Sequence, residues 1–109
     1  MANYGPTELQ CEATIIEAAR RFGWLVHGER PARAADGSYS TPIKGDPGWP
    51  DLVLVRNGEL IVRELKRLGN KPTQAQLDWL AALRLAGVDA EILVVPKDMD
   101  RFIEWLARR

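Results

Sequence analysis

The hydrophobic residues of this chain recur at spacings that predict three helices and four strands. Apolar positions three or four residues apart, as on one face of a helix, occur near both ends and after the midpoint. Short apolar runs bounded by polar residues or glycine, typical of strands, lie between them. The predicted elements are a helix over residues 8–22, strands over 24–27, 52–55 and 60–62, a helix over 74–86, a strand over 91–95, and a final helix opened by Asp98 or Asp100.

The first helix has sequence signals at both of its ends. Thr7 followed three residues later by Gln10 has the spacing of a capping box, and Gly23 suits the residue just beyond a helix. We expect its apolar stripe to include Leu9, Ile16 and Ala19.

The second helix repeats these signals. Thr73 and Gln76 have the capping-box spacing, and Gly87 follows the last helical position. Its predicted inward face consists of Leu77, Leu80, Ala81 and Leu83.

The last strand and the last helix complete the predicted core. Four successive apolar residues from Ile92 to Val95 suit burial on both faces, which indicates an inner strand reached through a crossover helix. The apolar side of the final helix is Met99, Phe102, Ile103 and Leu106.

The segment from Gly48 to Lys66 contains the charged residues that are the main candidates for a functional site. Its Asn57-Gly58 dipeptide is a strong signal for a two-residue hairpin turn. With this turn, the paired positions are Arg56 with Glu59, Val55 with Leu60, Val53 with Val62, and Asp51 with Glu64. Asp51 and Glu64 therefore lie opposite each other, and Lys66 shares their face because strand side chains alternate.

Two carboxylates facing each other indicate a cation site. Opposed like charges destabilise a sheet, and a divalent cation removes that penalty. Hard cations such as Mg²⁺ prefer oxygen ligands, and a nearby lysine can contact the same phosphate or water. We expect the rest of this face to be a buried apolar stripe, made of Val53, Val55, Leu60 and Val62.

Length and composition describe one ordinary globular domain. The 109 residues are enough for a single core without disulfides, and the lone Cys11 is expected to be a small buried apolar side chain. No segment has the length and apolarity of a membrane span or the pattern of a signal peptide, so we expect a cytoplasmic protein. The net charge of zero argues against a non-specific nucleic-acid coat.

The Pro50-Asp51 pair, followed after twelve residues by Glu64-Leu65-Lys66, resembles the PD-(D/E)xK nuclease motif. The surrounding segments GWPDLVLV and TQAQLDWLAALRLAGVDAEILVV are similar to the VRR-NUC branch, which is related to Holliday-junction resolvases. The resemblance runs from Thr7 to about Val95. It implies an α/β fold with a restriction-endonuclease-like core, a mixed four-stranded sheet flanked by helices, in a single domain over residues 1–109.

This resemblance implies a set of metal ligands. Asp51, Glu64 and the carbonyl of Leu65 would hold Mg²⁺ or Mn²⁺, and Lys66 would orient or deprotonate the attacking water or stabilise the phosphorane. A glutamate of the first helix often reaches such sites, and Glu12 has the matching position, with Glu8 as its competitor.

Two other residues have both a functional and a structural interpretation. Similar nucleases place a glutamine such as Gln76 beside the metal site, whereas the local pattern indicates that it caps Thr73. His27 could contact substrate or metal, although a lone histidine at a strand end is more often a hydrogen-bonded structural residue.

Several basic and aromatic residues are candidates for contact with DNA. The loop before Asp51 is long, as functional loops often are. Its Tyr39 and Trp49 could stack on a base or pack the loop onto the core. The basic residues of the central third are Arg30, Arg33, Lys44, Arg63, Lys66, Arg67 and Lys71, of which Arg30, Arg33, Lys44, Arg67 and Lys71 are the predicted DNA contacts.

These inferences favour a metal-dependent DNA endonuclease. A chain this small has no separate recognition domain, so the family resemblance implies structure-specific action on branched or junction DNA. Two cuts at a junction need two sites, which indicates a homodimer. The alternatives are a nucleic-acid-binding module that keeps the fold without catalysis, and a protein-interaction domain, which the zero net charge favours.

Overall fold

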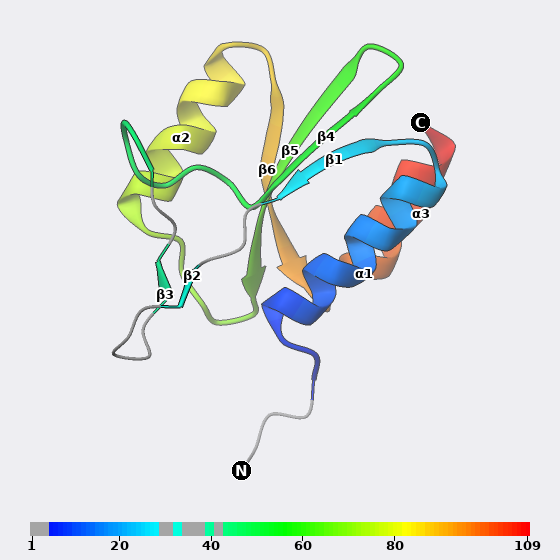
Figure 1. The fold of residues 1–109 in the computed structure, drawn as a ribbon, viewed down its shortest axis with the longest axis horizontal. Helices are drawn as coiled ribbons and strands as arrows, with labels where there is room; N and C mark the ends of the chain where they lie inside the picture. The colour runs from blue at the N-terminus through cyan, green and yellow to red at the C-terminus, as the bar shows by residue number, and fades with distance from the viewer. Residues whose placement is uncertain (1–4, 29–31, 34–38, 41–42) are drawn as a thin grey trace.

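A mixed sheet with helices on both faces organises the molecule (Figure 1). The structure is a computed structural model that describes residues 5–28, 32–33, 39–40 and 43–109, the backbone alone for 32–33 and 39–40. Its elements are α1 (Glu8–Arg21), β1 (Leu25–Gly28), β2 (Ala32–Arg33), β3 (Tyr39–Ser40), β4 (Leu52–Arg56), β5 (Glu59–Arg67), α2 (Gln74–Leu85), β6 (Asp89–Val95) and α3 (Met99–Arg108). The predicted order is confirmed, and a short antiparallel β2–β3 pair adds to it.

The four-stranded sheet has the order β1-β4-β5-β6. β1, β4 and β5 are antiparallel neighbours, whereas β6 runs parallel to β5 and is reached through α2. The prediction of an inner position for the last strand is wrong, because β6 lies at the edge of the sheet. It is apolar on both sides because helices cover both faces there: Leu93 packs in the cluster with α1 and α3, and Ile92 packs in the cluster under α2.

The hairpin between β4 and β5 has the predicted register. Asn57 and Gly58 both adopt positive φ, at 49° and 80°, as the tight turn requires. Arg56 then pairs with Glu59, and Val53 pairs with Val62. This register places Asp51, just before β4, level with the part of β5 that carries Glu64.

The helices begin as predicted, but the buried face of α1 is different. The capping boxes Thr7–Gln10 and Thr73–Gln76 are both complete. Leu9 is 62 % exposed, whereas Cys11 and Ile15, a few residues along, are fully buried. The stripe therefore runs through Cys11, Ile15 and Ala19, and the expectation that Cys11 is a small core residue is confirmed.

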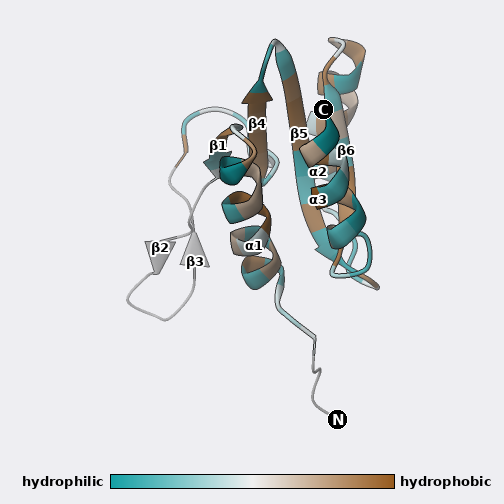
Figure 2. Cartoon of the chain, turned by 90° about the vertical axis from the view of Figure 1, so that its right-hand side faces the viewer, coloured by the Kyte–Doolittle hydropathy of each residue, from teal (hydrophilic) through white to brown (hydrophobic). Residues whose placement is uncertain are grey.

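The core consists of two clusters, one on each face of the sheet. The larger one joins β4, β5 and β6 to α1 and α3, and the apolar stretches of β4 and β5 are visible in Figure 2. The smaller one lies under α2 and centres on Val62, Leu80 and Ala90. The predicted buried stripe on this face is only partly right, because Val55 and Leu60 extend beyond α2 and are exposed. The predicted inward face of α2 is likewise narrower: Leu80 and Leu83 pack inward, but Leu77 and Ala81 are exposed.

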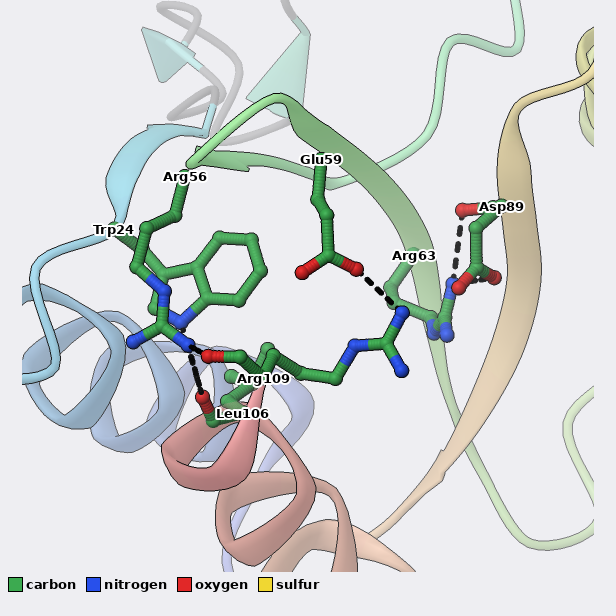
Figure 3. Close-up of polar contacts among 7 residues, drawn as sticks. All are labelled: Trp24, Arg56, Glu59, Arg63, Asp89, Leu106 and Arg109. Carbon is green, nitrogen blue, oxygen red and sulfur yellow. Dashed lines mark hydrogen bonds and ion pairs between the residues drawn. The ribbon is translucent and has the colours of Figure 1, made fainter.

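Two arginines of the hairpin are structural residues on the α3 face (Figure 3). Arg63 is 7 % exposed, forms an ion pair of 2.9 Å with Asp89, and stacks against the rings of Phe102 and Trp105. Arg56 lies over the Trp24 ring and donates to carbonyls at the end of α3. Arg63 is thus not part of a basic surface, contrary to its grouping with the basic residues of the central third.

No helix within the described part of the chain combines the length and apolarity needed to cross a bilayer.

Candidate active site

The three charged residues of the predicted motif meet on the α2 face of the sheet. Asp51 Oδ2 accepts a hydrogen bond of 2.8 Å from the Leu65 N–H, which ties the start of β4 to β5. Glu64 and Lys66 project from β5 toward the same face, and Lys66 Nζ lies 3.5 Å from Glu64 Oε2. The hairpin register alone produces this grouping, because alternate residues of β5 share a face.

Gln76 on α2 makes both of the contacts that its sequence suggested, and it makes them at the same time. Its Oε1 accepts from the Thr73 N–H at 2.9 Å, which completes the capping box. Its Nε2 donates to Glu64 Oε2 at 3.0 Å. The first turn of α2 is therefore connected directly to the buried carboxylate.

Glu64 has one oxygen with no hydrogen-bond donor. The side chain is 2 % exposed, and its Oε2 is bonded to Gln76 and Lys66. Its Oε1 is buried and receives no hydrogen bond from any of the described residues. Asp51 lies beside it and can share a hydrogen bond with it only while one of the two carboxyl groups is protonated, because two ionised carboxylates have no proton to donate. A buried carboxylate oxygen without a donor is costly, and a bound cation would satisfy it.

Burial raises the pKa of both carboxyl groups. The pKa of Glu64 is raised to about 8, mainly by removal from water and then by the neighbouring Asp51 charge, while Lys66 opposes the shift. The pKa of Asp51 is raised by burial and, to a smaller extent, by the Glu8 charge, although the Leu65 N–H and then Glu64 and Lys66 act in the opposite direction. The raised pKa values favour one proton on the pair near neutral pH, which a bound cation would displace.

The two glutamates of α1 have different surroundings. The carboxylate of Glu8 accepts hydrogen bonds from the Arg67 N–H at 3.0 Å and from Asn70 Nδ2 at 3.1 Å, so it joins α1 to the end of β5. Glu12 is half-buried, and burial followed by the Asp51 charge raises its pKa to about 7. Both glutamates of α1 therefore interact electrostatically with the site, since the Asp51 charge raises the pKa of Glu12 and the Glu8 charge raises that of Asp51. Within the described residues, however, no three acidic, histidine or cysteine side chains are close enough to hold one metal directly.

The loop before Asp51 is held against α2 by two contacts, of which only the packing of Trp49 was among the interpretations of the sequence. Gly48 adopts a φ of +100°, and a Cβ at this position would lie 2.5 Å from the backbone of Ala75. Trp49 packs edge-on against Trp79 with the ring centroids 5.0 Å apart. Trp49 thus packs its loop against α2, and the loop and the Gln76 helix turn form one rigid wall of the site.

The remaining predicted residues lie at varied positions. Lys44 and Lys71 are exposed, and Arg67 is half-buried at the end of β5. His27 is exposed on β1, opposite Val53 on the α2 face of the sheet. Arg30 and the side chains of Arg33 and Tyr39 lie outside the described residues.

Comparison with known proteins identifies the fold. No family model and no curated protein matches the sequence. A solved structure described as a VRR_NUC domain is similar to this chain, with 25% sequence identity and a TM-score of 0.56, over 86% of this chain and 95% of that one. The chain has the fold of a VRR_NUC domain. The VRR_NUC resemblance predicted from the motif and the restriction-endonuclease-like α/β core are both confirmed.

Proposed function

We propose that this VRR_NUC domain is a metal-dependent nuclease that hydrolyses phosphodiester bonds of DNA. The observation that carries the proposal is the buried Oε1 of Glu64, which no described donor satisfies, next to Asp51 and Lys66. A fold with no use for such a group would replace it with an apolar side chain, because unpaired buried charge destabilises the folded state. The VRR_NUC fold supports the same conclusion independently.

The residues present fit a hard divalent cation. Asp51, Glu64 and the carbonyl of Leu65 offer only oxygen atoms, which Mg²⁺ and Mn²⁺ prefer. Glu12, which stands further off, would act through a water molecule. A metal ion bound here would supply an activated water and offset charge on the phosphate oxygens.

The chain's own side chains have distinct tasks in this proposal. Gln76 holds Oε2 of Glu64 by a hydrogen bond of 3.0 Å, which leaves Oε1 as the oxygen available to a metal ion. Lys66, with a 16 % exposed side chain, lies beside Glu64 and would contact a phosphate oxygen or the attacking water. Burial strengthens each of these interactions, because the local dielectric constant is lower than that of water.

We further propose branched or junction DNA as the substrate and a homodimer as the active form. The described residues form a sheet flanked by helices and include no separate module for recognising sequence. Recognition of DNA shape suits such a domain better than recognition of sequence.

The test is a cleavage assay on linear duplex, single-stranded, flap and four-way-junction DNA, with Mg²⁺, Mn²⁺ or EDTA. We expect cutting only with a divalent metal and loss of cutting in Glu64→Gln and Lys66→Ala. The matched control is Glu91→Gln, which removes the charge of an exposed carboxylate on the neighbouring strand β6. Cutting in EDTA, or full activity in both site variants, would contradict the proposal, and binding without cutting would favour a non-catalytic module.

A further inference from the structure

A second site lies where the parallel strands β5 and β6 end. Residues at their carboxyl ends and in the following turns line a pocket of about 290 Å³: Arg67, Leu68, Asn70, Val95, Pro96 and Lys97. Arg67 pairs with Val95 across the two strands. In Figure 1 both strands end beside the beginning of α1. Ligands of α/β sheets commonly bind in the crevice beyond the carboxyl ends of parallel strands.

The pocket carries positive charge that the described residues leave unpaired. Neither Arg67 nor Lys97 forms a salt bridge with any described carboxylate. Glu8 lies close by, but its carboxylate already accepts hydrogen bonds from the Arg67 N–H and Asn70 Nδ2. With Glu8 counted, two cations and one anion leave the pocket able to attract an anionic group.

The pocket also has an apolar wall. Leu68 is 78 % exposed, and the exposed Pro96 lines the same space. None of the six lining residues is aromatic, so the pocket lacks a platform on which a base would stack. An apolar wall beside two cations matches a deoxyribose joined to its phosphate better than it matches a free inorganic anion.

We propose that this pocket binds a sugar–phosphate unit of the cleaved DNA strand, next to the bond that is cut, with Lys97 as a phosphate contact. The inference rests on the proposed nuclease function. Lys66 and Arg67 are consecutive residues that point to opposite faces at the same end of β5. A DNA strand that follows this end of the sheet can therefore contact both the catalytic site and the pocket.

The experiment measures binding of oligonucleotides in which one phosphate at a time is replaced by an uncharged methylphosphonate, with EDTA present to prevent cutting. For the wild-type protein we expect one linkage beside the cleavage position at which neutralisation weakens binding several-fold. In Lys97→Ala, neutralising that linkage should no longer weaken binding, because the lysine that contacts its phosphate is absent. The slope of log affinity against log salt concentration should be smaller by about 1 in Lys97→Ala than in the wild type. The ratio of wild-type to variant affinity should therefore fall about threefold between about 50 and about 200 mM salt.

Controls separate this inference from the function on which it rests. Arg20→Ala removes an exposed cation at the opposite end of α1 and should keep the wild-type profile at every linkage. Wild-type affinity, salt slope and linkage profile in Lys97→Ala would overturn the pocket while leaving the nuclease proposal intact. A wild-type protein that cuts or binds none of the DNA substrates would overturn both.

Discussion

Strand β5 buries a charged residue on each of its faces, and the two are treated in opposite ways. On the α3 face, Arg63 has an ion pair with Asp89 (Figure 3). It also has two carbonyl acceptors and lies against two aromatic rings. On the α2 face, Glu64 has a carboxylate neighbour and one oxygen with no described donor. The two residues are adjacent in sequence and almost equally buried.

The difference separates a charge whose partners the fold supplies from a charge whose partners are incomplete. A buried charge whose partners are all supplied by the fold contributes to a unique packing arrangement. A buried charge whose partners are incomplete destabilises the fold unless something from solution completes it. Burial alone would rank Arg63 and Glu64 together, whereas the count of partners distinguishes them.

We expect the largest effect from Glu64→Gln, which should slow DNA cleavage. The substitution keeps the shape and the contact with Gln76 but removes the charge that a cation needs. We expect the rate of DNA cleavage to fall at least ~10³-fold, since metal stabilisation of the reacting phosphate contributes several kcal/mol. Arg63→Met, on the opposite face, should keep cleavage within about tenfold wherever the protein is folded. If both variants fold and lose similar amounts of the DNA cleavage rate, the two faces of β5 do not differ in function.

We expect the next largest effect from Arg63→Ala, which should lower the stability of the folded protein. The variant loses the ion pair with Asp89 and the ring contacts with Phe102 and Trp105. We expect the free energy of unfolding in urea to fall by about 3 kcal/mol, to an equal extent with EDTA and with Mg²⁺. A loss that depended on metal would place Arg63 in the functional site.

The metal-free protein should lose stability as the pH rises. The folded pKa of Glu64, about 8, lies above its ordinary value of 4.5, so the folded state holds a proton that the unfolded state has released. Stability is therefore highest below about pH 4.5 as far as this group is concerned, and it declines up to about pH 8. Glu12, with a pKa of about 7, acts in the same direction.

Urea unfolding in EDTA at a series of pH values measures this effect. We expect wild-type protein to lose several kcal/mol across the window, since one pKa unit corresponds to about 1.4 kcal/mol, and Glu64→Gln to lose less. Mg²⁺ should restore the wild-type stability at the alkaline end. A wild-type profile that is flat, or that rises with pH, would show that Glu64 is already satisfied by the fold.

A smaller effect concerns the wall formed by the loop before Asp51. A Cβ at Gly48 would collide with the backbone of Ala75, so Gly48→Ala should cost about 2 kcal/mol and reduce cleavage. Gly45→Ala is a matched control, because its φ is also positive, at +96°, but nothing lies within 4 Å. It should cost about 1 kcal/mol, from backbone strain alone. Equal losses in urea unfolding and cleavage would mean that the loop does not position the site.

The smallest effect compares the two capping boxes. Thr73→Val and Thr7→Val each remove a hydroxyl that accepts an N–H hydrogen bond at a helix start, and each should cost about 1 kcal/mol. Only Thr73→Val should also slow cleavage, by a few-fold, because Gln76 of that box contacts Glu64. If Thr7→Val slows cleavage as much, helix stability rather than the Gln76 contact is responsible.

The sequence predicted the part of the site that depends on local geometry. Asn57-Gly58 determines the hairpin turn, the turn determines the register, and the register brings Asp51 to Glu64. Gln76 was identified because a capping box and a family resemblance both pointed to it. Each of these inferences needs only a few neighbouring residues.

The features that sequence reasoning missed depend on contacts between distant segments. Arg63 looked like a surface cation because its partners Asp89, Phe102 and Trp105 lie far along the chain. Gly48 reads as an ordinary loop glycine until Ala75 is seen packed against it.

The positions of whole elements were missed for a similar reason. Helical spacing indicates that α1 has an apolar stripe but does not locate its centre, so the predicted stripe includes the exposed Leu9 and omits the buried Ile15. Apolar residues on both faces of β6 indicate that helices cover both faces. Such coverage is found for edge strands as well as for inner strands, so it did not give the position of β6 in the sheet.

The central claim is that Glu64 binds a divalent cation. Its most direct test is calorimetric titration of Mn²⁺ into the metal-free protein near pH 7, in buffers of different ionisation enthalpy. Because the Asp51–Glu64 pair holds a proton without metal, we expect Mn²⁺ binding with release of about one proton, and weaker binding with little release in Glu64→Gln. Absence of Mn²⁺ binding, or equal binding and equal proton release in the two proteins, would contradict it.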